Sequence, residues 1–309
     1  MEKSSRHFGV PAMAAAAFLW SIAGLFIKII DWHPLTISGV RSLIAALVIL
    51  AWIKRPHGGR GPRFCLGIRF RRTRPWLFST GECRPFAQVA AALSYSATMI
   101  LFVSANKLTT SSNAIILQYI GPIFTAFLGA WILRERARIE HWIAFLFVAA
   151  GIGLMFMDKL GGGRFAGDIL ALLSALTFSL TFIFMRMQKG GSSLESMLLA
   201  HALTAVIGLT VSLFLPAPHW TAKALISVAI LGIFQVGLAA VLFSYAMKHI
   251  SAVTANLVAV IEPVFNPVWV FLVLGEAPGA RSIAGGLVII AAITAASVIN
   301  SRRIGNASA

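Results

Sequence analysis

Long apolar stretches, separated by short polar or charged segments, recur along the whole chain. Most of them hold about 20 residues, the length that an α-helix needs to cross the hydrocarbon core of a bilayer. We therefore expect an all-α membrane protein with ten transmembrane helices. The predicted ranges are Val10–Ile30, Pro34–Ile53, Phe86–Ala105, Ser111–Leu133, Glu140–Met157, Asp168–Met187, Leu194–Leu215, Lys223–Met247, Ala252–Leu274 and Ser282–Ile299.

The composition strengthens this assignment. Of the 309 residues, 58% are apolar and only 12% are charged, and the mean hydropathy is +0.85. Soluble domains are typically 45–50% apolar and about 25% charged, so a water-soluble fold is excluded. The only two cysteines, Cys65 and Cys83, lie in one basic stretch with no histidine cluster at zinc spacing. We expect no metal site and no cofactor.

The formal net charge of +16 needs its own explanation. Nucleic-acid binding is one, but in so apolar a chain Lys and Arg more often mark cytoplasmic loops. Of the 26 Lys and Arg residues, 19 fall on the side of the N-terminus, six on the other side, and Arg41 lies inside a helix. We therefore expect a lipid bilayer and not nucleic acid as partner. The predicted location is the plasma membrane, the inner membrane of a bacterium, with both termini cytoplasmic.

The chain contains an internal repeat at an offset of 141 residues, which aligns without a gap. Matches among Leu, Ala and Ile occur by chance in apolar sequences, but a proline within a helix and a glutamate at its end are costly in lipid. Each half then holds five spans, and an odd number inverts the second half relative to the first, as in secondary transporters. The aligned pairs are Leu101-Phe102 with Leu242-Phe243, Lys107 with Lys248, Ala114 with Ala255, Pro122 with Pro263, Phe124 with Phe265, and Glu135 with Glu276.

The stretch from Leu101 through Pro122 to Glu135, and its counterpart from Leu242 through Pro263 to Glu276, resemble the two EamA repeats of the drug/metabolite transporter superfamily. The resemblance covers nearly the whole chain. It implies two inverted five-helix repeats, in residues 1–160 and 161–309, around a central cavity that opens alternately to each side. It also implies transport, often outward, of a small-molecule substrate, without identifying that substrate.

One segment departs from the family pattern. Where relatives have a short loop between the second and third helices, residues 54–85 contain nine basic residues, one acid and both cysteines. A functional interpretation is a polybasic arm on anionic lipid headgroups, at about 1 kcal/mol per basic residue. The interpretation that we favour is a spurious or poorly ordered replacement of the loop, outside the transport path.

Glu262 is the acid placed deepest in a predicted span, where an ionised carboxylate costs roughly 2.5–3.5 kcal/mol. It must be paired, solvated or protonated, so it either serves a cationic substrate or a coupling proton, or it is structural. Pro122 and Pro263 each remove a backbone donor and break the helical ladder. The carbonyl groups that lose their donor can face a cavity, and residues about one turn away lie on the same face of the helix. Gln118, Tyr119 and Asn266 are therefore candidate substrate-binding residues, or they only shape packing.

Arg41 lies about 10 Å along the second helix, at 1.5 Å per residue. It either attracts an anionic substrate or a carboxylate, or extends to the outer headgroups. Trp20 in the first helix is a further candidate for lining the cavity. His201, in the seventh helix, is another, although a lone Trp or His in a helix bundle more often only packs.

Small residues at four-residue spacing predict close helix contacts. They also make a homodimer contact plausible on the same surfaces. The residues are Gly121, Thr125 and Gly129 in the fourth helix and Ala149 and Gly153 in the fifth.

The leading functional hypothesis is a secondary transporter of small polar or amphipathic metabolites, with export as the expected direction. A membrane-embedded enzyme would need paired aspartates, a zinc-binding His-Glu-x-x-His helix or a serine with a histidine base within the membrane. None of these patterns is present. A scaffold without transport activity predicts neither duplicated mid-helix prolines nor a buried acid. The missing phosphate-binding loop argues against ATP-driven transport.

Overall fold

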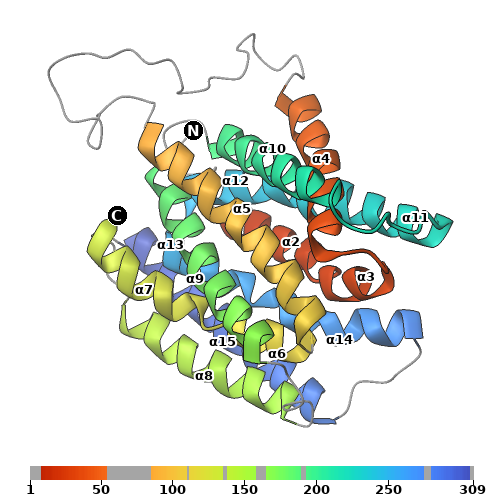
Figure 1. The fold of residues 1–309 in the computed structure, drawn as a ribbon. Coiled ribbons are helices and arrows are strands. Elements are labelled where there is room, and N and C mark those ends of the chain that lie inside the picture. Colours follow the sequence, from red (N-terminus) through yellow and green to blue (C-terminus); the bar gives the residue numbers. More distant parts are fainter. Residues whose placement is uncertain are drawn as a thin grey trace, which may run out of the picture.

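The computed structural model describes residues 8–53, 85–109, 111–134, 138–157, 165–188, 193–274 and 280–306. Every regular element within these ranges is a helix (Figure 1). The helices are α2 Gly9–Trp20, α3 Ala23–Ile29, α4 Pro34–Ile53, α5 Pro85–Leu108, α6 Ser111–Gln118, α7 Gly121–Ile132, α8 Ile139–Phe156, α9 Phe165–Met187, α10 Ser193–Ser212, α11 Ala222–Ile230, η2 Leu231–Leu238, α12 Ala239–His249, α13 Ala252–Ala259, α14 Ile261–Leu274 and α15 Ala280–Asn306.

All ten predicted spans are helical. Six are long and apolar enough to cross a membrane by length and composition, and shorter apolar helices occupy the other four. Four spans are divided: the first into α2 and α3, the fourth into α6 and α7, the eighth into α11, the π-helix η2 and α12, and the ninth into α13 and α14. The main difference in boundaries is at the last span, where α15 runs to Asn306 instead of ending at Ile299.

The fourth and ninth spans are interrupted at equivalent places. α6 ends at Gln118, and α7 begins with Pro122 as its second residue. α13 ends at Ala259, exactly one repeat offset after Gln118, and Pro263 is the third residue of α14. Because proline lacks an N–H and its ring crowds the preceding turn, each helix ends before the proline and restarts around it.

These two broken spans cross each other in opposite directions. Tyr119 contacts Glu262, and Thr125, six residues later in the first span, contacts Asn256, six residues earlier in the second. Contacts that advance along one helix while they retreat along the other require antiparallel helices. The crossing lies inside the bundle, since Thr125 and Asn256 are buried.

The helices of the two halves interleave. α5 packs against α9 and α10, α4 packs against α10 and η2, and α2 packs against α12, α13 and α14. α8 and α15 lie together along one side (Figure 1). The main hydrophobic core therefore draws side chains from both halves of the chain.

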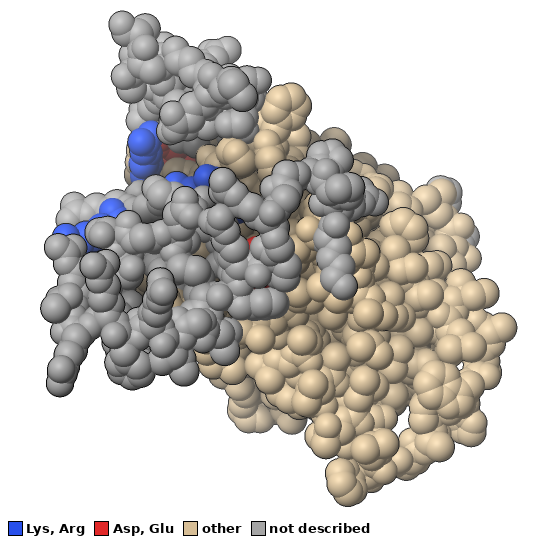
Figure 2. Space-filling view, turned by 90° about the horizontal axis from the view of Figure 1, so that it is seen from above, with Lys and Arg blue, Asp and Glu red and all other residues tan. Residues whose placement is uncertain are grey.

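The outside of the bundle is apolar. Large side chains such as Phe127, Leu146 and Leu287 are more than half exposed. In Figure 2 the visible basic side chains lie on the left of the view, and the broad surface on the right shows neither basic nor acidic residues. Figure 1 places both termini at the same end of the bundle, as an even number of spans requires. These features fit a bundle surrounded by lipid.

Several sequence predictions lie outside the described residues: Glu135, Glu276 and all of the basic segment except Pro85, the first residue of α5.

The small residues of the fourth and fifth spans behave differently from each other. Gly121 packs against α9, as predicted. Among the residues that the structure describes, the prediction of close contact for Gly153 is wrong, because a Cβ there would meet nothing within 4 Å.

The backbones of α4 and α10 approach each other closely at two glycines. A Cβ on Gly208 would lie 2.6 Å from the Leu35 carbonyl oxygen and 2.7 Å from Cα of Gly39. These atoms belong to backbone and cannot turn away as a side chain could. Only glycine at both positions allows the two helices to touch here.

We expect Gly208→Ala to lower stability by about 1–3 kcal/mol, because the added methyl group forces α4 and α10 apart. The measurement is the thermal unfolding midpoint of the purified protein in detergent. Gly153→Ala is the matched control, and it should raise stability by about 0.5–1 kcal/mol, since alanine favours helix where space is open. Equal midpoints for the two variants would contradict this account of the contact.

Candidate functional site

Tyr119 and Glu262 meet where the two broken helices cross. The Tyr119 hydroxyl lies 2.9 Å from Oε2 of Glu262 and 3.3 Å from the carbonyl oxygen of Ala259. Ala259 is four residues before Pro263, so its carbonyl is the acceptor that the proline cannot serve. One phenol thus stands between a freed backbone carbonyl and a buried carboxylate, and it can donate its proton to either.

Glu262 has no cationic partner in the part of the chain that the structure describes. It is 7% exposed, and Tyr119 is its only side-chain hydrogen-bond partner there. A buried carboxylate with a single neutral donor is poorly compensated, because a charge removed from water needs several donors or a counter-ion. The carboxyl group is therefore prepared to accept a proton or a cation from outside the protein.

Gln118, the neighbour of Tyr119, points elsewhere. Its Nε2 donates to Oγ of Ser174 on α9, 3.2 Å away. One turn further along α9, the Ser179 hydroxyl donates to the carbonyl oxygen of Gly121 at 2.8 Å. These two hydrogen bonds attach the break in the fourth span to α9. Gln118 contributes to this attachment and does not contact the Glu262 pair. Asn266 lies on α14, but its side chain is outside the described residues.

Arg41 on α4 is completely buried, so the alternative that it extends to the headgroups is wrong. Its Nη1 donates to Oε1 of Gln235 at 3.3 Å, and its Nη2 donates to the carbonyl oxygen of Met99 at 3.4 Å. Gln235 lies in the π-helix η2, a rare element that is frequent at functional sites. Gly232 of η2 lets that helix approach the Arg41 carbonyl and Ile44 closely.

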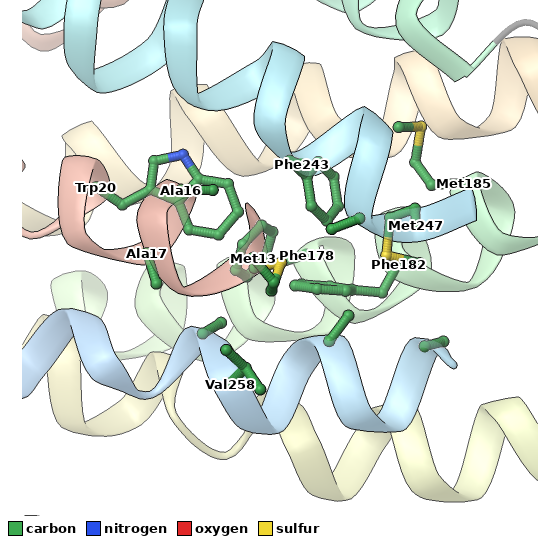
Figure 3. Close-up of a cluster of buried hydrophobic side chains, with 14 of the residues drawn as sticks. Met13, Ala16, Ala17, Trp20, Phe178, Phe182, Met185, Phe243, Met247 and Val258 are labelled. Carbon is green, nitrogen blue, oxygen red and sulfur yellow. The ribbon is translucent and has the colours of Figure 1, made fainter. Parts of the chain in front are cut away.

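Trp20 belongs to a cluster of aromatic rings in the middle of the bundle (Figure 3). Its ring centroid lies 5.4 Å from that of Phe178 on α9 and 5.5 Å from that of Phe243 on α12. Phe182 joins the same two rings at 4.8 and 5.0 Å, so the contacts close into a ring of edge-to-face pairs. Such pairs can offer a ligand both the electronegative faces and the electropositive edges of their rings.

Tyr95 on α5 and His201 on α10 were not among the predicted site residues, yet they extend this cluster. Their rings are 5.3 Å apart, and Tyr95 also lies 6.5 Å from Phe178. Tyr95 is within electrostatic reach of both Arg41 and Glu262, and His201 is within reach of Arg41.

Several polar atoms around these rings have no hydrogen-bond partner within the described ranges. They are Nε1 of Trp20, Nε of Arg41, the Tyr95 hydroxyl and both ring nitrogens of His201. Each buried polar group without a partner costs about 1–3 kcal/mol, and most native buried groups avoid that cost. So many in one neighbourhood indicates that water or a ligand completes them.

The structure thus brings Glu262 and Tyr119 into contact, packs Trp20 and Tyr95 on Phe178, and places Tyr95 within electrostatic reach of Arg41 and Glu262. The described residues contain no group of three His, Cys, Asp or Glu side chains that could hold a metal ion. The arrangement suits non-covalent binding of a small molecule that carries charge and an apolar portion.

Comparisons with known proteins identify a family whose model matches most of the chain. The model of the EamA-like transporter family matches residues 7–157 and again residues 165–298. An S-adenosylmethionine uptake transporter of Rickettsia prowazekii (strain Madrid E) is 26% identical over 214 residues, which cover 68% of this chain and 70% of the relative. An uncharacterized transporter of Archaeoglobus fulgidus is 21% identical over 289 residues, covering 93% and 95%.

The fold itself is also found among solved structures. A crystal structure superimposes with a TM-score of 0.74 and covers 96% of this chain and 98% of its own. Its sequence identity is 19%, so the likeness concerns the fold alone.

We expect Gln235→Leu to lower stability by about 1–3 kcal/mol, because the buried guanidinium of Arg41 loses an acceptor. Thermal unfolding in detergent measures the change. Gln235→Glu is the matched variant: it keeps an oxygen acceptor and adds a counter-charge, so it should retain most of the stability. Equal loss in both variants would show that the contact with Arg41 is not what matters at this position.

Proposed function

The chain belongs to the EamA-like transporter family, and we propose that it is a secondary transporter of small polar or amphipathic metabolites. In this proposal the substrate crosses the inner membrane of a bacterium by alternating access to a central cavity, and both termini are cytoplasmic. The resemblance favours export, whereas the Rickettsia relative is named for uptake. One cavity serves either direction, because the driving gradient sets the net flux.

We propose that residues 1–160 and 161–309 are inverted repeats, and the helix packing supports this. Exchanging the halves in chain order pairs α2–α3 with α9, α4 with α10, α5 with η2–α12, and α8 with α15. Under this exchange, the contact between α5 and α9 corresponds to the contact between α12 and α2. The contact between α5 and α10 corresponds to the contact between η2 and α4. The contacts α4–α10 and α8–α15 map onto themselves.

The observation that carries the proposal is the crossing of the two broken helices, with Tyr119 and Glu262 at the crossing point. Discontinuous helices that meet near the middle of the membrane are the usual site of substrate and ion binding in secondary transporters. A buried ionisable residue at that depth marks the transport pathway more often than it serves packing.

Protonation of Glu262 would rearrange this crossing. An ionised carboxylate accepts the hydrogen bond from the Tyr119 hydroxyl. A protonated carboxyl carries its own O–H and can donate it, which leaves Tyr119 to donate to the Ala259 carbonyl instead. The proton thus changes which backbone and side-chain groups tie the two halves together. We propose that this exchange couples a pH gradient to the opening and closing of the cavity.

Transport is tested with the purified full-length protein in liposomes. The vesicles are loaded with unlabelled amino acids, amines, nucleosides or S-adenosylmethionine, and entry of the labelled compound is followed. We expect saturable entry of at least one solute, accelerated by the same solute inside. Vesicles in which no solute of the panel shows this acceleration would contradict the transporter proposal and favour a scaffold.

In Glu262→Gln, accumulation driven by a pH gradient should be lost while exchange of substrate across the bilayer persists with a higher half-saturating concentration. Glutamine keeps the shape of the side chain but cannot take up a proton or hold a cation. Glu195→Gln, the same change in the first turn of α10, is the control and should behave as wild type. Normal transport in both assays with only a lower unfolding midpoint would make Glu262 structural.

A further inference from the structure

The unpaired polar atoms in the bundle belong to side chains from four different helices. Trp20 is on α2, Arg41 on α4, Tyr95 on α5 and His201 on α10. The rings of Tyr95 and His201 are in contact, Trp20 and Tyr95 both pack on Phe178, and Arg41 is within electrostatic reach of Tyr95 and His201. All four side chains are almost completely buried. They form one neighbourhood, which we call the donor end.

Most of the unpaired atoms at the donor end are hydrogen-bond donors; the exception is one nitrogen of the neutral His201 ring, which accepts. An indole N–H and a guanidinium N–H can only donate hydrogen bonds, and a phenol donates readily. The guanidinium adds a positive charge, and its planar edge matches a carboxylate. A group that satisfies these atoms must be rich in acceptors and negatively charged. A carboxylate meets both requirements with two oxygens.

The opposite charge within electrostatic reach of Tyr95 is Glu262. Glu262 has Tyr119 but no cation among the described residues, and it forms no ion pair there with Arg41. Tyr95 is within electrostatic reach of both charges. The protein therefore buries one positive and one negative group that do not neutralise each other.

The aromatic cluster that Tyr95 joins through Phe178 supplies the apolar part of the neighbourhood. Trp20, Phe178, Phe182 and Phe243 supply apolar surface and π-faces, which accommodate both a hydrocarbon chain and a cation. An uncharged nucleoside or sugar would leave both buried charges without a partner. A simple amine or a simple carboxylate would leave one of the two buried charges without a partner.

From this geometry we propose that the substrate is a zwitterion, with a carboxylate bound at the donor end and an amine or other cationic group bound at Glu262 and Tyr119. Its apolar portion lies against the aromatic rings. This inference rests on the proposed transport function and narrows it to one class of substrate. Binding of such a molecule neutralises both buried charges at once, which makes the loaded state the one that can change conformation at low electrostatic cost.

The test compares zwitterions with analogues that lack one charge. The probes are phenylalanine, phenylalaninamide and 3-phenylpropionate, together with 6-aminohexanoate, hexylamine and hexanoate, so that the spacing of the two charges also varies. Binding to the purified full-length protein is measured as a concentration-dependent rise of the unfolding midpoint. In at least one series we expect the zwitterion to reach half saturation at a concentration at least tenfold below that of both analogues.

The three tyrosines of the chain provide matched variants. Tyr95→Phe should weaken binding of the zwitterion and the carboxylate about fivefold or more and leave the amine analogue unchanged. Tyr119→Phe should weaken the zwitterion and the amine analogue and leave the carboxylate unchanged. Tyr245→Phe, at the partly exposed end of α12, should change nothing. Because the Tyr95 hydroxyl has no hydrogen-bond partner among the described residues, its removal should not impair folding.

The inference is overturned if a singly charged analogue binds as well as its zwitterion, if no zwitterion shifts the midpoint, or if the solute transported best is an uncharged nucleoside. Equal effects of Tyr95→Phe and Tyr119→Phe on all probes would also overturn it. The liposome exchange assay distinguishes this failure from failure of the transporter proposal. A protein that exchanges nucleosides but not zwitterions is still a transporter, with a different substrate class.

Discussion

A carbonyl group that loses its helical donor inside an apolar bundle must find another, and this constraint organises the centre of the protein. Pro263 cannot serve the carbonyl of Ala259, and the hydroxyl of Tyr119 takes its place. That hydroxyl comes from the other half of the chain, from a helix interrupted at the equivalent position. The same hydroxyl also contacts Glu262. The backbone defect, the junction between the halves and the buried acid are therefore one structural feature.

The second buried charge is held quite differently. Arg41 is fixed by Gln235 from the π-helix and by the Met99 carbonyl, neither of which is anionic. A guanidinium held by neutral acceptors keeps much of its electrostatic attraction for an anion, because nothing nearby has neutralised it. The protein thus stabilises the position of each charge without cancelling it. Such an arrangement costs stability and is understandable where a ligand supplies the missing counter-charges.

Close packing makes this central layer rigid enough to hold its geometry. The glycine contact between α4 and α10 brings those backbones together beside the donor end, and Gly232 brings η2 against α4. The two elements that carry Arg41 and Gln235 are therefore fixed by backbone contacts. The helices that carry Tyr119 and Glu262 are instead divided, so the two sides of the layer differ in stiffness. Movement during transport is expected on the side of the broken helices.

The sequence by itself determined the ten spans, the places where two of them break, and the presence of an acid and a base deep in the bundle. These properties depend on residues close together in the chain: hydropathy over about 20 positions, a proline that cannot donate, and a charge inside an apolar run. The sequence also singled out Tyr119, Glu262, Arg41 and Trp20. The sequence could not distinguish Gln118 from these residues, although its side-chain amide donates to Ser174 and not to the Glu262 pair.

Only the tertiary structure revealed Tyr95, His201 and Gln235 as members of the same layer. Gln235 contacts a residue 194 positions away, and Tyr119 contacts one 143 positions away. A tyrosine or histidine in a span has no local pattern that distinguishes packing from binding, because its role depends on whether a partner arrives from another helix. The π-helix left no periodic signal that we recognised in the sequence. Which buried charges are paired and which remain open is decided by contacts between distant segments, and these form only when the helices pack.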